Sequence, residues 1–315
     1  MPRRFSRRAF LSAAAAMPLA GGQILRPSGG AMQQPLPQPP AIRRAVRTSM
    51  LPSGASWTSR IAVAAAAGFD GLDVEAVESP VEAEEIAQAA AQYKLAIESV
   101  VCTATRRYPL SSADPGLQAK GVAALKTALT AAAMWRAEDV VITPAVVDET
   151  TPPSVAWSRS QAVLRDQILP LAGGFKVHVA IEVPTDKFIL SPADCNRYID
   201  ELRSPWIRAS LRVCEASGAG IVGTPPEWIR TLARRLTGLR LNDRHLNRAA
   251  GTAERRNLGD GDVDWQAVRK AMSEAPFLTW VTADLDGGDG AYISNVRIRV
   301  DKFLAGFKPG AGPGA

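Results

Sequence analysis

Short apolar runs alternate with longer helical segments along most of the chain. The runs are rich in Val, Ile and Leu and lie at residues 45–50, 71–77, 95–101, 139–147, 177–182, 206–213, 236–243 and 279–285. Segments of helical character follow them at residues 57–68, 79–93, 116–135, 152–172, 192–201, 225–236, 264–273 and 291–305. Apolar runs separated in this way are typical of parallel strands joined by right-handed helical crossovers.

Eight such strand–helix units predict an α/β fold, a single (β/α)₈ TIM barrel spanning residues 45–306. Each unit has the size of one βαβ step, and the total suits a barrel of about 250 residues. An open doubly wound sheet is the alternative, but no GxGxxG motif follows the first apolar run. A Gly/Pro-rich tail occupies residues 307–315.

Residues 1–31 have the pattern of a twin-arginine export signal. Arg7 and Arg8 precede Phe10 and an alanine-rich run that is too short to span a membrane. A Pro/Gln-rich linker follows at residues 32–44. We therefore expect a periplasmic or other extracytoplasmic protein with no integral membrane segment once the signal is removed.

This signal also changes how the net charge is interpreted. The formal charge of the whole chain is +6, but five arginines precede Met32, and removing them leaves +1. The basic composition therefore reflects targeting and does not indicate a nucleic-acid partner.

Cysteine and histidine are too scarce to build a typical metal or redox centre. The three cysteines, Cys102, Cys195 and Cys214, have no CxxC spacing and apolar neighbours, which predicts buried thiols. The two histidines are His178 and His245. His178 lies early in its apolar run and is expected in the core, whereas His245 is the only imidazole expected near the ligand end.

The stretch from Val177 to Glu215 contains the clearest candidate site. One apolar run ends at Glu182, and the next run along the chain ends at Arg212. In parallel α/β folds the ends of the strands face the ligand. The two side chains should therefore lie side by side, either as an ion pair or as ligand contacts.

Several phrases resemble the sugar-phosphate isomerase/epimerase family, the xylose-isomerase-like TIM barrels. They are AGFDGLDVEAV (67–77), YPLSSADP (108–115), SPADCNRYIDELRSPWI (191–207), PPEWIRTLARRL (225–236) and LGDGDVDWQAVRKAM (258–272). Their order covers most of the chain from Val46 to Leu304. The resemblance implies a sugar substrate and a divalent metal such as Mn or Mg, held by Glu, Asp, His and Glu.

The metal ligands implied by the resemblance are only partly present. Glu182 matches the first glutamate, and Asp284 stands one methylene short of the last. Arg212 and Arg240 stand where the family has Asp and His, and a guanidinium has no lone pair to offer a metal. We therefore expect no metal ligands and no bound metal cofactor here, unless a loop supplies replacements.

The remaining candidates follow from their positions at strand ends. Glu182 and Asp284 are candidate acid/base residues, and Arg212 and Arg240 could bind an anionic ligand or only neutralise nearby carboxylates. Further candidate substrate-binding residues are Glu75, Asp243 and His245. Asp243 could instead anchor a loop.

By resemblance, the sequence predicts a protein that binds a small carbohydrate or anionic sugar derivative at the carboxyl-terminal mouth of the barrel and isomerises or epimerises it. Two alternatives stay open. One is a non-catalytic carbohydrate-binding pseudoenzyme that has lost its metal. The other is a metal-free lyase or epimerase using Glu182 and Asp284 as acid and base.

Overall fold

The computed structural model describes residues 42–185, 187–218, 220–247, 252–275 and 278–307. The predicted export signal and most of the predicted linker lie outside these residues, as does nearly all of the C-terminal tail. No helix among the described residues combines the length and apolarity needed to cross a membrane.

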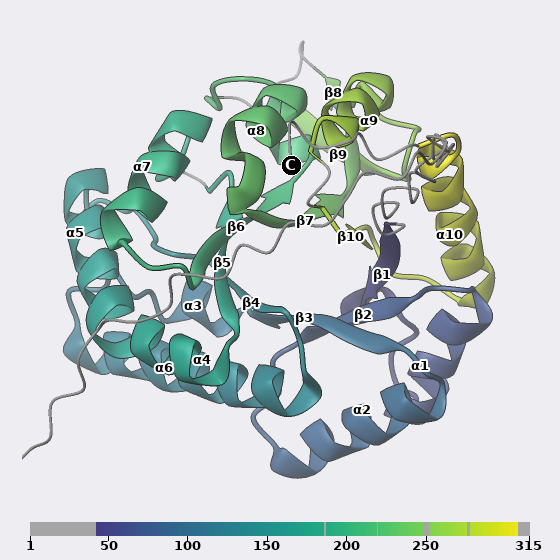
Figure 1. Cartoon of the computed structure of the whole chain (residues 1–315), viewed down its shortest axis with the longest axis horizontal. Coiled ribbons are helices and arrows are strands. Elements are labelled where there is room, and N and C mark those ends of the chain that lie inside the picture. Colours follow the sequence, from purple (N-terminus) through teal and green to yellow (C-terminus); the bar gives the residue numbers. More distant parts are fainter. Residues whose placement is uncertain (1–41, 186, 219, 248–251, 276–277, 308–315) are drawn as a thin grey trace, which may run out of the picture. The chain divides into compact units, whose positions relative to one another are not determined.

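Eight parallel strands close into a barrel in the order β1-β10-β7-β6-β5-β4-β3-β2, with the helices around them (Figure 1). The barrel strands are β1 (Arg43–Arg47), β2 (Gly71–Glu75), β3 (Ala96–Cys102), β4 (Asp139–Ile142), β5 (His178–Val183), β6 (Ile207–Arg212), β7 (Leu236–Leu241) and β10 (Trp280–Ala283). The predicted (β/α)₈ barrel is confirmed, with every predicted apolar run contributing one strand.

The helices connect successive strands as predicted. They are α1 (Trp57–Ala66), α2 (Pro80–Gln92), α3 (Ala104–Arg107), α4 (Pro115–Trp135), α5 (Pro153–Val163), α6 (Leu169–Phe175), α7 (Pro192–Leu202), α8 (Pro225–Leu232), α9 (Trp265–Ser273) and α10 (Gly290–Leu304). A π-helical turn, Leu164–Ile168, joins α5 to α6, and short 3₁₀ turns lie at Thr48–Met50, Cys214–Ser217 and Ala233–Arg235.

Helix starts follow the capping residues in the sequence. The side chain of Ser79 accepts a hydrogen bond from the backbone N–H of Glu82, which satisfies one free donor of α2. The Glu82 carboxylate accepts from Trp57 Nε1 at 3.0 Å, which ties α2 to α1. Thr224 and Glu227 form a full capping box at α8.

The short helix α3 and two strands were not predicted. The polar stretch at the end of the seventh apolar run forms an antiparallel hairpin of β8 (Asp243–Asn247) and β9 (Thr252–Arg256). The side chains of β9 are exposed and largely charged or polar, so these strands carry none of the apolar signal that revealed the others.

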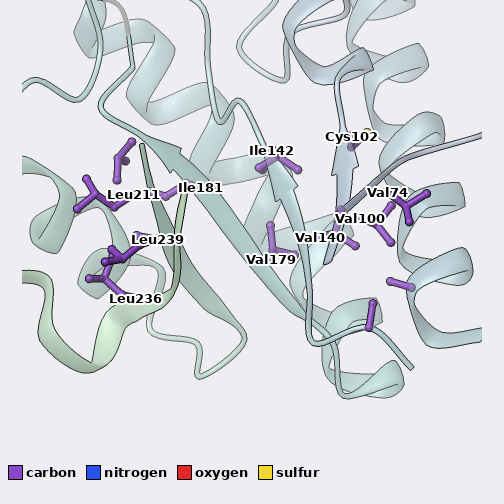
Figure 2. Close-up of a cluster of buried hydrophobic side chains, with 14 of the residues drawn as sticks. Val74, Val100, Cys102, Val140, Ile142, Val179, Ile181, Leu211, Leu236 and Leu239 are labelled. Atoms are coloured by element: carbon purple, nitrogen blue, oxygen red, sulfur yellow. The ribbon is translucent and has the colours of Figure 1, made fainter. Parts of the chain in front are cut away.

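Successive side chains along each barrel strand lie alternately in the core between strands and helices and inside the barrel. Val179 and Ile181 of β5 join the large core between strands and helices, part of which Figure 2 shows. Ala180, between them, instead clusters with Val101 and Val141 in a separate small group inside the barrel. Successive strand side chains point to opposite faces, so β5 brings Glu182 to the inner face. The three cysteines are free and buried, as predicted.

Candidate functional site at the barrel mouth

Arg212, at the end of β6, links three carboxylates at the carboxyl-terminal mouth. Its Nε lies 3.5 Å from Glu182 Oε1 and 3.4 Å from Asp284 Oδ2, and its Nη2 lies 3.1 Å from Glu215 Oε1. The neighbouring position of Glu182 and Arg212 follows from β5 and β6 pairing in parallel register. The expected ion pair is therefore present, and it extends further than the sequence indicated.

Arg47, at the end of β1, extends the network on the other side of Asp284. Its Nη1 lies 3.2 Å from Asp284 Oδ1, and its Nη2 lies 3.1 Å from Glu75 Oε1. We call the connected set Glu75, Arg47, Asp284, Arg212, Glu182 and Glu215 the mouth network. Sequence reasoning missed Arg47 and Glu215, although Arg47 ends β1 just as Arg212 ends β6.

Asp284 occupies the centre of this network and is almost fully buried, with 3% of the residue exposed. Burial by itself would raise its pKa, but the charges of Arg212, Arg240 and Arg47 outweigh burial, so the pKa of Asp284 lies below its ordinary value. Asp284 therefore stays ionised at neutral pH and holds the two outer arginines in place.

Arg240 lies below the mouth and is 2% exposed. Its Nη1 donates to Asp73 Oδ2 at 2.5 Å, its Nε donates to Ser210 Oγ at 3.1 Å, and its Nη2 lies 3.5 Å from Ser99 Oγ. Every nitrogen of this guanidinium thus faces a protein acceptor. Of the two roles left open by the sequence, the geometry favours neutralisation of a buried carboxylate over ligand contact.

Two further carboxyl groups lie buried inside the barrel, on β3 and β4. Burial raises the pKa of Glu98 well above its usual range, and burial raises the pKa of Asp139 from 3.8 to about 7. Asp139 Oδ1 has no hydrogen-bond partner among the described residues. These groups are costly to ionise, so their contribution to stability depends on pH.

Asp139→Asn is expected to stabilise the protein at pH 7.5 and to have little effect near pH 4. The folded-state pKa is raised, so the contribution of Asp139 is fully present below pH 3.8 and is lost as pH rises to about 7. Urea denaturation of both proteins across this range measures the difference. The exposed Asp166→Asn is the control, and equal pH slopes for wild type and Asp139→Asn would contradict the prediction.

Asp243 anchors a loop through its carboxylate. Its carboxylate accepts hydrogen bonds from the backbone N–H groups of Arg244, Gly259, Gly261 and Val263 and from Trp265 Nε1. A Cβ on Gly261 would lie 2.1 Å from Asp243 Oδ1, so only glycine fits there. The loop-anchoring alternative thus has direct geometric support.

His245 lies on the hairpin, away from the mouth network. Its side chain is 54% exposed, and its Nδ1 lies 3.1 Å from Asp262 Oδ1. His178 is half-buried in β5 beside Trp206, with ring centroids 5.4 Å apart. Burial lowers the pKa of His178, although the residue is half-buried at the start of β5 and not in the core as expected.

A cavity of about 190 Å³ opens between the ends of β6, β7 and β10 and the β8–β9 hairpin. Two members of the mouth network, Glu215 and Asp284, line it. Larger hollows lie along α9 and α10, between α5 and α7, and beside the ends of β2 and β3. Of these hollows, the small cavity is the one lined by members of the mouth network.

The residues at the mouth do not fit a divalent metal. Such a site needs several anionic or neutral donors converging on one point, but Arg212 lies between Glu182 and Asp284. Among the described residues no group of three or more His, Cys, Asp or Glu side chains could hold an ion. The two carboxylates are instead bound to arginine.

A family model described as xylose isomerase-like TIM barrel matches residues 61–297. No curated protein matches the chain.

Solved structures share the fold over most of the chain. D-psicose 3-epimerase, in the presence of D-fructose, is 16% identical, with 86% of this chain and 100% of that chain covered and a TM-score of 0.70. L-ribulose 3-epimerase is 18% identical, with 84% and 95% covered and a TM-score of 0.69. 3-Keto-D-glucoside 4-epimerase from E. coli is 13% identical, with 84% and 99% covered and a TM-score of 0.66. At these identities the likeness shows the fold alone.

Proposed function

Because the chain belongs to the xylose isomerase-like TIM barrel family, we propose that it binds a small carbohydrate at the carboxyl-terminal mouth of its barrel, without a divalent metal. The sugar epimerases among its structural neighbours support the ligand class. The mouth network carries the proposal, since it sets carboxylates and guanidinium groups in fixed alternation where ligands of such barrels bind.

The chemistry of the mouth network suits hydroxyl groups. A sugar hydroxyl both donates and accepts a hydrogen bond, a carboxylate accepts, and a guanidinium donates. The side chains of Glu75 and Glu215 are 43% and 27% exposed, and that of Glu182 is 16% exposed, so ligand can reach them. Ion pairing holds these groups in place before binding, which reduces the ordering cost of association.

Isomerisation or epimerisation of the bound sugar is the second candidate. Glu182 and Asp284 approach the same nitrogen of Arg212, and a proton shuttle between two carboxylates would need such convergence. However, a general acid or base works best with a pKa near the working pH, and the pKa of Asp284 is lowered. The lowered pKa of Asp284 therefore favours binding over proton transfer.

Isothermal titration of the purified chain with common aldoses and ketoses tests the proposal. We expect saturable binding of at least one monosaccharide, weakened about tenfold or more in Glu182→Gln because a hydrogen bond to a charged group is lost. The matched control is Glu274→Gln, which removes a carboxylate paired with Arg230 outside the mouth. Absence of binding across the panel, or equal binding in both variants, would refute the site.

Proton NMR in D₂O separates the two candidates. An isomerase or epimerase that moves a proton through a carboxylate would wash solvent deuterium into the bound sugar. We expect no incorporation with any sugar that binds. Incorporation that disappears in Glu182→Gln would establish the catalytic alternative.

A further inference from the structure

The cavity beside the mouth network contains a cation whose donors are not used by the protein. Arg244, at the second position of β8, lines this cavity together with Cys214, Glu215, Asn242, Arg255 and Asp286. Its Nε and Nη2 atoms are buried and have no hydrogen-bond partner among the described residues. A guanidinium is always charged in proteins, so buried donors of this kind call for an acceptor.

The carboxylates that line the same cavity are already engaged. Glu215 pairs with Arg212 and accepts from Asn242 Nδ2 at 2.5 Å, and Asp286 pairs with Arg255 at 3.0 Å. Asp284 is held by Arg47 and Arg212, and Asp243, which also lines the cavity, accepts hydrogen bonds from backbone N–H groups and from Trp265 Nε1. Two arginines line this cavity, and among the described residues Arg244 is the one whose guanidinium forms no ion pair. A Cβ on Gly218 would lie 3.0 Å from its Nη2.

We propose that Arg244 binds the carboxylate of a sugar acid, so that the ligand of the barrel mouth is a monosaccharide carrying one carboxylate group. This inference rests on the proposed carbohydrate-binding function and names the class of sugar. A planar guanidinium fork matches a carboxylate and forms charge-assisted hydrogen bonds with it. The hydroxyl groups of the same ligand would face the mouth network, because Glu215 and Asp284 belong to both sites.

Charge and size favour a carboxylate over a phosphate. A phosphate monoester carries about −1.5 to −2 charges at neutral pH, and the surplus would face Glu215 and Asp286. One negative charge balances the one unengaged guanidinium. The cavity volume of about 190 Å³ is below the roughly 300–1,000 Å³ of pockets for drug-sized ligands, which suits one sugar ring.

Titration with matched sugar sets tests this inference at constant ionic strength. The probes are D-glucose, D-glucuronate and D-glucose 6-phosphate, and the same three forms of D-galactose. In one set or both, we expect the uronate to bind about ten- to a hundredfold more tightly than the neutral sugar, the range for hydrogen bonds to charged partners. Arg244→Gln should abolish this preference, whereas Arg244→Lys should keep part of it.

The outcomes distinguish this inference from the function on which it rests. Arg230→Gln, an exposed arginine paired with Glu274 away from the mouth, is the matched control and should behave as wild type. If neutral sugars bind and uronates bind no better, or if Arg244→Gln keeps the preference, the inference fails and the proposed function stands. Tighter binding of the phosphate through Arg244 would overturn the carboxylate assignment. If no sugar binds, both fail.

Discussion

Arg240→Gln is expected to lower the free energy of unfolding by about 3–5 kcal/mol, the range for breaking a buried ion pair by removing one partner. Arg240 is 2% exposed and Asp73 is fully buried, and the two are joined at 2.5 Å. The substitution leaves Asp73 as a buried charge without its cation. Burial lowers the pKa of Arg240, but Asp73 and Asp284 more than compensate, so its net pKa is raised and the guanidinium stays charged.

Urea denaturation at neutral pH measures this loss. The double variant Arg240→Gln with Asp73→Asn should recover a large part of it, because no isolated charge is then left in the barrel. Arg235→Gln is the control, since Arg235 pairs with Asp200 at the surface and such pairs contribute about 1 kcal/mol or less. If Arg240→Gln lowers the free energy of unfolding no more than this control does, the buried pair of Arg240 and Asp73 does not stabilise the barrel as proposed.

The purified protein is expected to contain no stoichiometric Mn, Mg, Co or Zn at the barrel mouth. Arginine offers no lone pair to a metal, and a pair of unit charges 4 Å apart interacts with about 4 kcal/mol at an effective dielectric constant near 20. A divalent ion near Arg212 and Arg47 would experience several repulsive contributions of this kind. Glu182 and Asp284 are also already paired.

Elemental analysis of the purified chain and titration with Mn²⁺ measure this directly. Arg212→Asp combined with Arg240→His should begin to create Mn²⁺ affinity, because it removes two cations and supplies two donors. Arg212→Leu with Arg240→His is the matched control, which removes the same charges but supplies one donor fewer. One equivalent of Mn or Zn in the wild type, lost in Glu182→Gln, would contradict the prediction. Because Arg240→His also removes the partner of Asp73, circular dichroism should first show that each variant is folded.

The sequence by itself determined the barrel and the end at which charged side chains gather. Each barrel strand and each of the longer helices follows from a local pattern, because apolar spacing over a few residues reflects which face is buried. Parallel strands all end at one side of the barrel. The clustering of Glu75, Glu182, Arg212 and Asp284 therefore followed from their positions at strand ends alone.

Local sequence patterns could not predict the β8–β9 hairpin or the position of Glu215, for different reasons. The strands β8 and β9 are mostly polar, and β9 is exposed along its whole length, so their pairing leaves no apolar trace in the sequence. Glu215 lies in a short 3₁₀ turn after β6, and only the path of that turn brings it back to Arg212 at 3.1 Å. Both depend on chain geometry rather than on the type of residue.

Only the tertiary structure separated Arg212 from Arg240, which look equivalent in the sequence as cations near the ends of neighbouring strands. Arg212 reaches the mouth, whereas Arg240 lies beneath it and donates to Asp73, 167 residues away in the chain. Arg47 likewise meets Asp284 across 237 residues. Such pairings are set by the register in which distant strands close the barrel. A carboxylate at a strand end predicts where charge lies, and only closure of the barrel decides which cation neutralises it.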